Sequence, residues 1–266
     1  MIRKMKIIIS PAKKMNVSDD IFEYRDMPIF LDKAEELKNY IKSLPYEECK
    51  SIWKCNDKIA ELNYSRFQNM NLNKRLTPAI FSYEGIQYQY MGVKVLDQSS
   101  LEYLQEHLRI LSGFYGILRP LDGVVPYRLE MQAKLIKHQN KNLYDYWSDQ
   151  IAAQLFSETD LIINLASKEY SKCIEKYMPK NEESIINSKE GAYNKKIEFI
   201  TCTFGELKDE KVVEKGTIVK MARGQMVKYL AENNVTSLEE LKKFNSMGYK
   251  YSESRSQKDN YVFIKE

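Results

Sequence analysis

Short apolar runs and longer stretches with helical spacing alternate irregularly along the 266-residue chain. Uninterrupted apolar runs are typical of strands that are buried on both faces of a covered sheet. They predict strands at residues 5–9, 79–82, 161–165, 184–187, 197–203, 217–221 and 261–265. Helical periodicity predicts helices at residues 32–43, 46–68, 99–111, 144–156, 167–177, 223–233 and 237–244. The last helix begins with a capping box, in which Ser237 is the N-cap and Glu240 follows three residues later.

The irregular alternation predicts an α/β (α+β) fold in which helices surround a mixed sheet, rather than a doubly wound sheet. The sequence shows no repeat of 20–50 residues and no low-complexity linker. We therefore expect residues 1–266 to form a single compact domain. The sequence also lacks GxGxxG and GxxxxGK[ST], the two commonest nucleotide-binding fingerprints.

The sequence predicts a cytoplasmic protein. The apolar run at residues 7–9 is too short for a signal peptide, and no run approaches the ~20 apolar residues of a membrane span. The four scattered cysteines lack a CxxC pair, and their even number would permit two disulfides, but the absence of a signal peptide favours reduced thiols. We expect a monomer that does not contact membranes. The net charge of +4 permits nucleic-acid binding without requiring it, so any electrostatic interpretation has to be local.

The segment with the most functional information is residues 108–131, LRILSGFYGILRPLDGVVPYRLEM. Leu104, Leu108 and Leu111 form one helical stripe, a break with two glycines follows, and a second short apolar run comes next. This pattern predicts a helix-hairpin-helix-like element over about residues 99–124. Glycine at such a turn lets backbone amides approach a phosphate oxygen, and the start of the next helix adds partial positive charge.

The hairpin and the arginines near it are therefore candidate contacts to a nucleic-acid backbone, because amides and guanidinium groups both bind phosphate. These candidates are Arg109, Ser112, Gly113, Tyr115, Gly116, Arg119 and Arg128. The alternative is that the glycines serve packing alone. Since Pro120 pushes the preceding residue toward extended backbone, a strand and turn is the second interpretation of the latter half.

Three basic groups follow predicted elements elsewhere in the chain. Ser10 and Lys13 follow the first strand, Lys168 follows the strand at 161–165, and Arg223 begins a predicted helix. Ligands gather where the strands of α/β sheets end, so each group is a candidate phosphate contact. The competing interpretation is a set of solvated side chains and a capped surface helix.

Metal and redox chemistry have weaker support. His107 and Glu106 are adjacent and point apart on a helix, so they do not form the Glu-x-x-His pair of an iron site. The cysteines lack zinc or iron–sulfur spacing. We predict no metal site and no cofactor, and we disfavour direct sensing of peroxide by a thiol.

The sequence resembles the YaaA family of peroxide stress proteins over most of its length. The matching stretches are IISPAK at 8–13, DKIA at 57–60, HLRILSGFYGILRPLD at 107–122, PYRLEM at 126–131, NLAS at 164–167 and ARG at 222–224. The resemblance implies a compact α/β body with a helix-hairpin-helix-like element, a positively charged cleft and binding of double-stranded or branched DNA. It also implies protection against hydrogen peroxide with lowered free intracellular iron. One departure is Ile86, where members of the family usually carry an acidic residue.

The leading hypothesis is a DNA-binding protein of the oxidative stress response, and the sequence favours binding over enzymatic activity. The alternative is a glycosylase- or lyase-like enzyme that acts on nucleic acid through a lysine or a carboxylate. Its candidate groups are Lys13, Lys168, Asp122 and Glu130, with no catalytic role assigned to any of them. A third possibility is a stress protein that acts through a protein partner.

Overall fold

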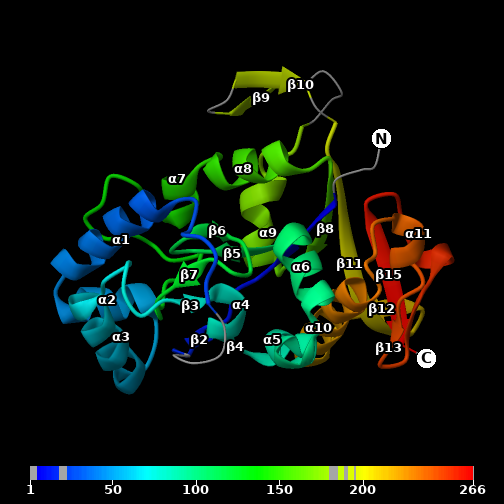
Figure 1. Cartoon of the computed structure of the whole chain (residues 1–266), viewed down its shortest axis with the longest axis horizontal. Helices are drawn as coiled ribbons and strands as arrows, with labels where there is room; N and C mark the ends of the chain where they lie inside the picture. Colours follow the sequence, from blue (N-terminus) through cyan, green and yellow to red (C-terminus); the bar gives the residue numbers. More distant parts are fainter. Residues whose placement is uncertain (1–4, 18–22, 180–184, 189–190, 195, 266) are drawn as a thin grey trace.

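A mixed sheet of nine strands runs through the middle of the protein in the computed structural model (Figure 1). The structure describes residues 5–17, 23–179, 185–188, 191–194 and 196–265. The strand order is β13 (Asn245–Ser246), β14 (Tyr249–Tyr251), β15 (Asn260–Lys265), β11 (Glu198–Lys208), β8 (Leu161–Leu165), β1 (Met5–Ile9), β5 (Leu108–Ser112) and β6 (Gly116–Leu118), while β12 (Lys211–Val213) pairs with β11. Three strand pairs lie outside this sheet: β2 (Lys14–Met15) with β4 (Tyr83–Glu84), β3 (Thr77–Pro78) with β7 (Gly123–Val124), and β9 (Ile185–Ser188) with β10 (Gly191–Asn194).

The five central strands, β15, β11, β8, β1 and β5, are parallel. All residues of β1, β5 and β8 are buried, as expected for strands that are covered on both faces. In the register, Ile7 lies between Leu108 of β5 and Ile163 of β8. Because the strands are parallel, their carboxyl ends meet at one edge of the sheet.

Helices surround this sheet, as the mixed α/β prediction requires. They are α1 (Leu31–Ser43), α2 (Tyr46–Trp53), α3 (Asp57–Asn69), α4 (Ala79–Ser82), α5 (Ile86–Met91), η1 (Val93–Val95), α6 (Gln98–His107), α7 (Leu143–Trp147), α8 (Gln150–Glu158), α9 (Lys168–Glu175), α10 (Gly216–Glu232), α11 (Leu238–Leu241) and η2 (Glu253–Arg255). Helix α6 packs on β1, α10 packs on β11, and the two helices contact each other. Helices α1–α3 gather at one end of the molecule, and α11 with the C-terminal strands lies at the opposite end (Figure 1).

Most predicted elements are confirmed. Strands β1 and β8 have the predicted bounds, β11 and β15 lie where strands were predicted, and α11 begins with the predicted capping box. The predicted strand at 184–187 corresponds to β9, although residue 184 is outside the described residues. The predicted helix at 46–68 is two helices, α2 and α3, joined by a tight turn in which Lys54 has a φ of 45°.

Two predicted strands are wrong. Residues 79–82 form the single turn of helix α4, and residues 217–221 belong to the long helix α10. The second error follows from β-branched residues in the sequence TIV, which favour strands only weakly. Tertiary packing overrides this preference, since α10 packs closely against α5.

The predicted helix-hairpin-helix-like element is also wrong. Helix α6 ends at His107, and the chain continues as strand β5, a turn and strand β6, which pair as an antiparallel hairpin. The strand-and-turn alternative for the second half is therefore confirmed. The stripe of leucines predicted helix where the structure has strand β5, because a short apolar run fits a buried strand as well as a helix. Arg109 interrupts the run in the sequence but is itself buried in the middle of β5.

None of the helices in the described part of the chain combines the length and the apolar character that crossing a bilayer requires.

Candidate anion-binding pocket

A cavity of about 400 Å³ opens at the carboxyl edge of the parallel sheet. We call it the strand-end pocket. Its walls come from the segments after β1 and β8, the start of α5, the segment after β7 and the second turn of α10. The polar residues that line it are Ser10, Lys13, Lys14, Glu84, Gln87, Tyr88, Tyr127, Arg128, Glu130, Ser167, Glu169, Tyr170, Lys220 and Arg223.

Two serines fix the strand ends that form one wall. Ser10 follows β1, and its hydroxyl accepts a hydrogen bond of 2.8 Å from the backbone amide of Ser167, two residues beyond β8. The two hydroxyls also lie 3.1 Å apart, and Tyr88 of α5 donates to the carbonyl of Ser10 at 2.9 Å. Ser167 occupies the predicted N-cap position of α9, but its side chain does not cap the helix. Its hydroxyl lies against Ser10 instead.

Lysines at the mouth of the pocket are exposed and paired with acids. Lys13 Nζ lies 3.0 Å from Glu130, and Lys14 Nζ lies 2.7 Å from Glu84. The two lysine side chains are 66% and 69% exposed. Exposed ion pairs of this kind contribute little stability, so an incoming anion can replace the carboxylate at low cost.

The arginines lie deeper. The Arg128 side chain is only 11% exposed, and its Nη2 lies 2.8 Å from Glu130. Arg223 is carried into the wall by α10, and burial lowers its pKa. The Nε atoms of both arginines are buried and have no hydrogen-bond partner among the described residues. A buried donor without a partner is costly, so each such group in a folded protein calls for an explanation.

The close packing of α10 on α5 sets the position of Arg223. At Gly224, an added Cβ would overlap the backbone oxygen of Gln87 in α5. Gln87 and Tyr88 line the same pocket. The small residue therefore lets one helix approach the other until side chains from both reach a common cavity.

Three acids temper the positive charge of the lining. The lining contains five basic side chains and three acidic ones. The basic residues are Lys13, Lys14, Arg128, Lys220 and Arg223, and the acidic residues are Glu84, Glu130 and Glu169. Burial raises the pKa of Glu169, and the backbone amide of Gln132 donates to its Oε1 at 3.3 Å. The lining thus has an excess of positive charge, which an anionic ligand would compensate.

The β5–β6 hairpin supports the pocket from inside the protein. Ser112 lies 2.6 Å from the hydroxyl of Tyr127, which lies 2.7 Å from the hydroxyl of Tyr83. The backbone amides of Phe114 and Tyr115 donate to the hydroxyl of Ser112. Burial raises the pKa of Tyr127 to about 12, so the ring stays neutral and hydrogen-bonded at the pocket wall.

Four predicted contacts in the hairpin are therefore in the wrong place for a backbone ligand. Ser112, Gly113, Tyr115 and Gly116 are all buried. At Gly113, an added Cβ would overlap the carbonyl oxygen of Leu129, so the glycine serves close packing. The amides of this turn cannot reach a polymer outside the protein, and the packing alternative accounts for the two glycines.

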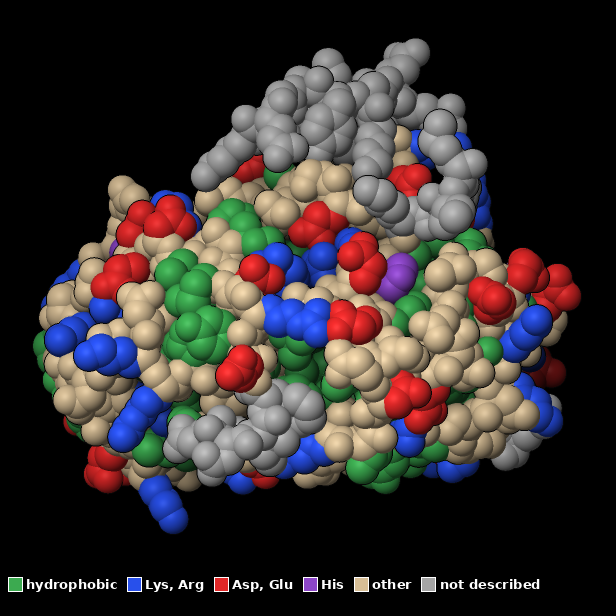
Figure 2. Space-filling model, in the orientation of Figure 1, with side chains coloured by type: hydrophobic (Ala, Val, Ile, Leu, Met, Phe, Trp, Pro, Cys, Tyr) green, Lys and Arg blue, Asp and Glu red, His purple; other side chains and the backbone are tan. Residues whose placement is uncertain are grey.

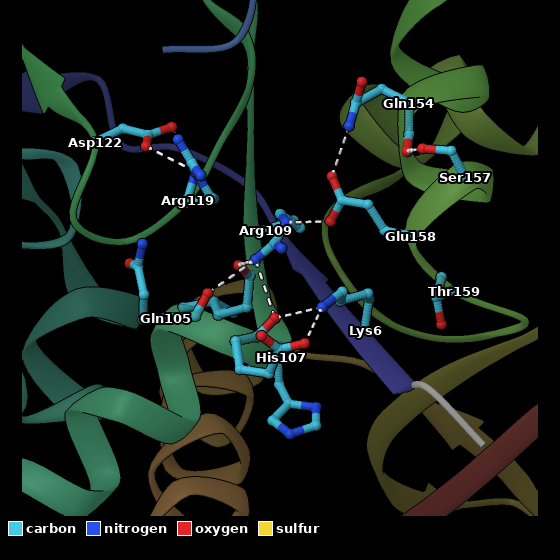
Figure 3. A network of polar contacts seen from close by, with 12 residues as sticks. Lys6, Gln105, His107, Arg109, Arg119, Asp122, Gln154, Ser157, Glu158 and Thr159 are labelled. Atoms are coloured by element: carbon cyan, nitrogen blue, oxygen red, sulfur yellow. Dashed lines mark hydrogen bonds and ion pairs between the residues drawn. The ribbon is translucent and has the colours of Figure 1, made fainter. Parts of the chain in front are cut away.

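Arg109 and Arg119 do not reach the pocket either. Arg109 is buried, and its Nε donates to Glu158 at 2.6 Å while its Nη1 donates to three carbonyl oxygens at the end of α6 (Figure 3). Arg119 pairs with the buried Asp122 at 3.0 Å and with Asp26 at 3.3 Å. Both arginines therefore form ion pairs with acids inside the fold, and Arg109 also donates hydrogen bonds to carbonyl oxygens. Their predicted role in binding phosphate is not supported by these positions.

Of the predicted site residues, the pocket brings together Ser10, Lys13, Arg128 and Arg223. Lys168 lies outside it, exposed and paired with Glu175. Of the groups considered for an enzyme, Lys13 and Glu130 share the pocket, whereas Asp122 is buried beside Arg119.

Sequence reasoning missed several pocket residues, among them Glu169, Tyr88 and Glu84. Glu169 had a usable signal, because it lies in the first turn of a helix that directly follows a parallel strand. Tyr88 and Glu84 gave none, since the packing of α5 and the pairing of β4 with β2 bring them there. Ile86, the departure from the family pattern, also lines the pocket.

Charge elsewhere on the surface is mixed. Across the middle of the face drawn in Figure 2, Lys and Arg side chains are interleaved with Asp and Glu.

Burial raises the pKa of Cys49 to about 11 and those of Cys173 and Cys202 to about 12, and it also raises the pKa of Cys55. High thiol pKa values disfavour reactive thiolates. Within the described ranges, no three His, Cys, Asp or Glu side chains are grouped so that they could hold a metal ion.

Comparison with known proteins gives full-length similarity. A family model described as "Peroxide stress protein YaaA" matches residues 5–255. The chain is 51% identical over 261 residues to a UPF0246 protein of Desulfitobacterium hafniense, which covers 98% of each chain. It is 51% identical to a UPF0246 protein of Lachnoclostridium phytofermentans, over 98% of this chain and 96% of the relative. A UPF0246 protein of Ligilactobacillus salivarius is 48% identical, over 98% of this chain and 100% of the relative.

Proposed function

The chain belongs to the YaaA family of peroxide stress proteins, and we propose that it binds the phosphate backbone of DNA during the response to hydrogen peroxide, with the strand-end pocket at the centre of the interface. One observation carries the proposal. Basic side chains from three distant parts of the chain, Lys13, Arg128 and Arg223, line one pocket, and the Nε atoms of the two arginines have no hydrogen-bond partner among the described residues. The lowered level of free iron implied by the resemblance stays a prediction.

The exposed lysines supply the first contact in this proposal. A phosphate of a duplex lies on the outside of the helix and can approach Lys13 and Lys14 at the mouth. Such contacts release counterions and position the protein without reading base sequence. In the interface predicted from sequence, backbone amides of the hairpin contact phosphate. In the interface proposed from the structure, lysine and arginine side chains make these contacts, because the hairpin amides are buried.

The turn between α2 and α3 carries exposed charges of both signs, because Asp57 lies between its lysines. The turn between α2 and α3 includes exposed Lys54 and Asn56, and Lys58 is exposed in the first turn of α3. Cys55 in this turn is within electrostatic range of Arg128 and Glu130. A duplex that covers the mouth of the pocket would therefore also meet Lys54 and Lys58, beside the carboxylate of Asp57.

The test compares two lysines that have similar exposure and one glutamate partner each. Lys13 and Lys137 are 66% and 69% exposed, and each pairs with a less exposed glutamate, Glu130 and Glu48 respectively. We expect Lys13→Gln to weaken binding to duplex DNA about eightfold at 0.1 M salt and to reduce the slope of log K against log salt by about 0.9, as one lost phosphate contact requires. Fluorescence anisotropy over a salt series measures both.

The Lys137→Gln variant controls for the loss of one positive charge from the protein. It should bind like the wild type, and the effect of Lys13→Gln should be the same on two duplexes of unrelated sequence. Equal weakening by both substitutions would show a non-local charge effect and contradict the proposed interface. Absence of measurable duplex binding by the wild type would contradict the function itself.

A further inference from the structure

We infer that the interior of the strand-end pocket binds one nucleoside monophosphate unit, and that in DNA this unit is a nucleotide that has left the base-paired stack. The inference deepens the proposed function and rests on it only for the source of the nucleotide. The binding chemistry is the same for a free nucleotide and for an unpaired position in a strand.

The size of the cavity points to a single unit. Its volume of about 400 Å³ lies at the lower end of the range of small-molecule sites, about 300–1,000 Å³. A duplex cannot enter such a space, since its phosphates follow the outside of a helix. Proteins that handle individual bases solve this problem by taking one nucleotide out of the stack into a fitted pocket.

The deep arginines provide the anion site. Within the described part of the chain, the buried Nε donors of Arg128 and Arg223 have no partners, and guanidinium groups bind phosphate through two parallel hydrogen bonds. The exposed lysines at the mouth are enough for the outer phosphates of a duplex. Because Arg128 and Arg223 line the cavity, a phosphate has to enter it to contact their guanidinium groups.

The remaining lining suits a sugar and a base. Pro11, Ile86 and Leu129 provide apolar surface, and the side chains of Ser10 and Ser167 place hydroxyl groups near the strand ends. Ile86 matters most, because an acidic side chain at this position would place a negative charge in the same wall. In this chain the wall is apolar there, which favours an anion in the cavity.

Isothermal titration calorimetry with deoxyadenosine monophosphate tests the inference directly on the whole protein. We expect saturable binding with one site per chain. Arg223→Gln should weaken it about tenfold or more, because it removes a charged hydrogen-bonding partner. Lys137→Gln should leave it unchanged. No binding by the wild type, or equal binding by Arg223→Gln, would overturn the inference.

A second variant guards against a folding defect in Arg223→Gln. Ile86→Glu changes a half-buried wall residue and adds a repelling charge without removing an arginine. It should abolish nucleotide binding while circular dichroism and thermal unfolding stay close to those of the wild type. A folded Ile86→Glu protein that binds the nucleotide normally would contradict the assigned cavity.

Two DNA ligands then separate the sources. If the unit comes from DNA, a duplex with one bulged nucleotide should bind several-fold more tightly than the perfect duplex, and Arg223→Gln should remove this difference. Nucleotide binding without any DNA binding would support a free nucleotide as the ligand and reject the proposed function. Duplex binding that shows no bulge preference, together with no nucleotide binding, would reject the inference and leave the proposed function standing.

Discussion

At the scale of single residues, the arginines differ by what surrounds them rather than by where they stand in the sequence. Arg109 and Arg119 lie next to the glycines that drew attention to this segment, yet both are paired with acids inside the fold. Arg128 also pairs with an acid, Glu130, but its Nε and that of Arg223 have no hydrogen-bond partner among the described residues. The partner of Arg109 is Glu158, which is 49 positions away. A single sequence cannot reveal such a pairing, so charge alone overestimated the number of contacts to phosphate.

Asp122 should make the stability of the protein depend on pH. Burial raises its pKa to about 6, against the attraction of Arg119 and with some repulsion from Asp26. The folded state therefore holds the proton more tightly than the unfolded chain, whose aspartate pKa is about 3.9. The stabilising contribution is complete below about pH 4 and is lost as the pH rises through 6, by about 3 kcal/mol in all.

Denaturant unfolding of the wild type and of Asp122→Asn between pH 4 and pH 7 measures this contribution. Because asparagine does not titrate, the stability of the wild type relative to the variant should decline across this interval. A constant difference at every pH, or a difference that grows in favour of the wild type as the pH rises, would contradict the raised pKa.

At the scale of elements, a single substitution at Gly224 should disrupt the contact between α5 and α10. Gly224→Ala adds a methyl group that overlaps the backbone of Gln87. Forced separation of the helices should cost about 1–3 kcal/mol in the free energy of unfolding. It should also weaken DNA binding, because Tyr88 and Arg223 lie on the two elements that are pushed apart.

Gly216→Ala is the matched control in the same helix. An added Cβ at Gly216 meets nothing within 4 Å, so alanine there should be neutral or stabilise the protein by up to about 1 kcal/mol. Chemical unfolding and anisotropy on both variants make the comparison. Equal behaviour of the two variants would show that the close approach at Gly224 does not position the pocket.

The elements also show what local pattern can and cannot predict. Strands β1 and β8 were found with their bounds because each is an uninterrupted apolar run. The sequence pattern predicts helix for strand β5, because its leucines continue the stripe of α6 and Arg109 interrupts the apolar run. It predicts a strand for residues 217–221, because only their contact with α5 reveals that they are helical.

At the scale of the whole molecule, the ends of the parallel strands predicted residues that line the pocket. Ser10 and Lys13 were predicted from the rule that ligands gather at the carboxyl ends of parallel strands, and they line the pocket. The hairpin motif was less reliable, because the same glycines serve close packing. Residues such as Tyr88 and Glu84 come from a helix and a short strand whose position depends on the complete fold, so the pocket could not be assembled from sequence.

Hydrogen–deuterium exchange of the whole protein, with and without a saturating duplex, tests most directly whether the strand-end pocket is where DNA binds. We predict slower exchange on DNA binding in the segments that form the mouth, residues 10–16, 84–88 and 167–171, with the β5–β6 hairpin unchanged because it is buried with or without ligand. Protection confined to other surfaces, with these three segments unchanged at saturation, would contradict the account.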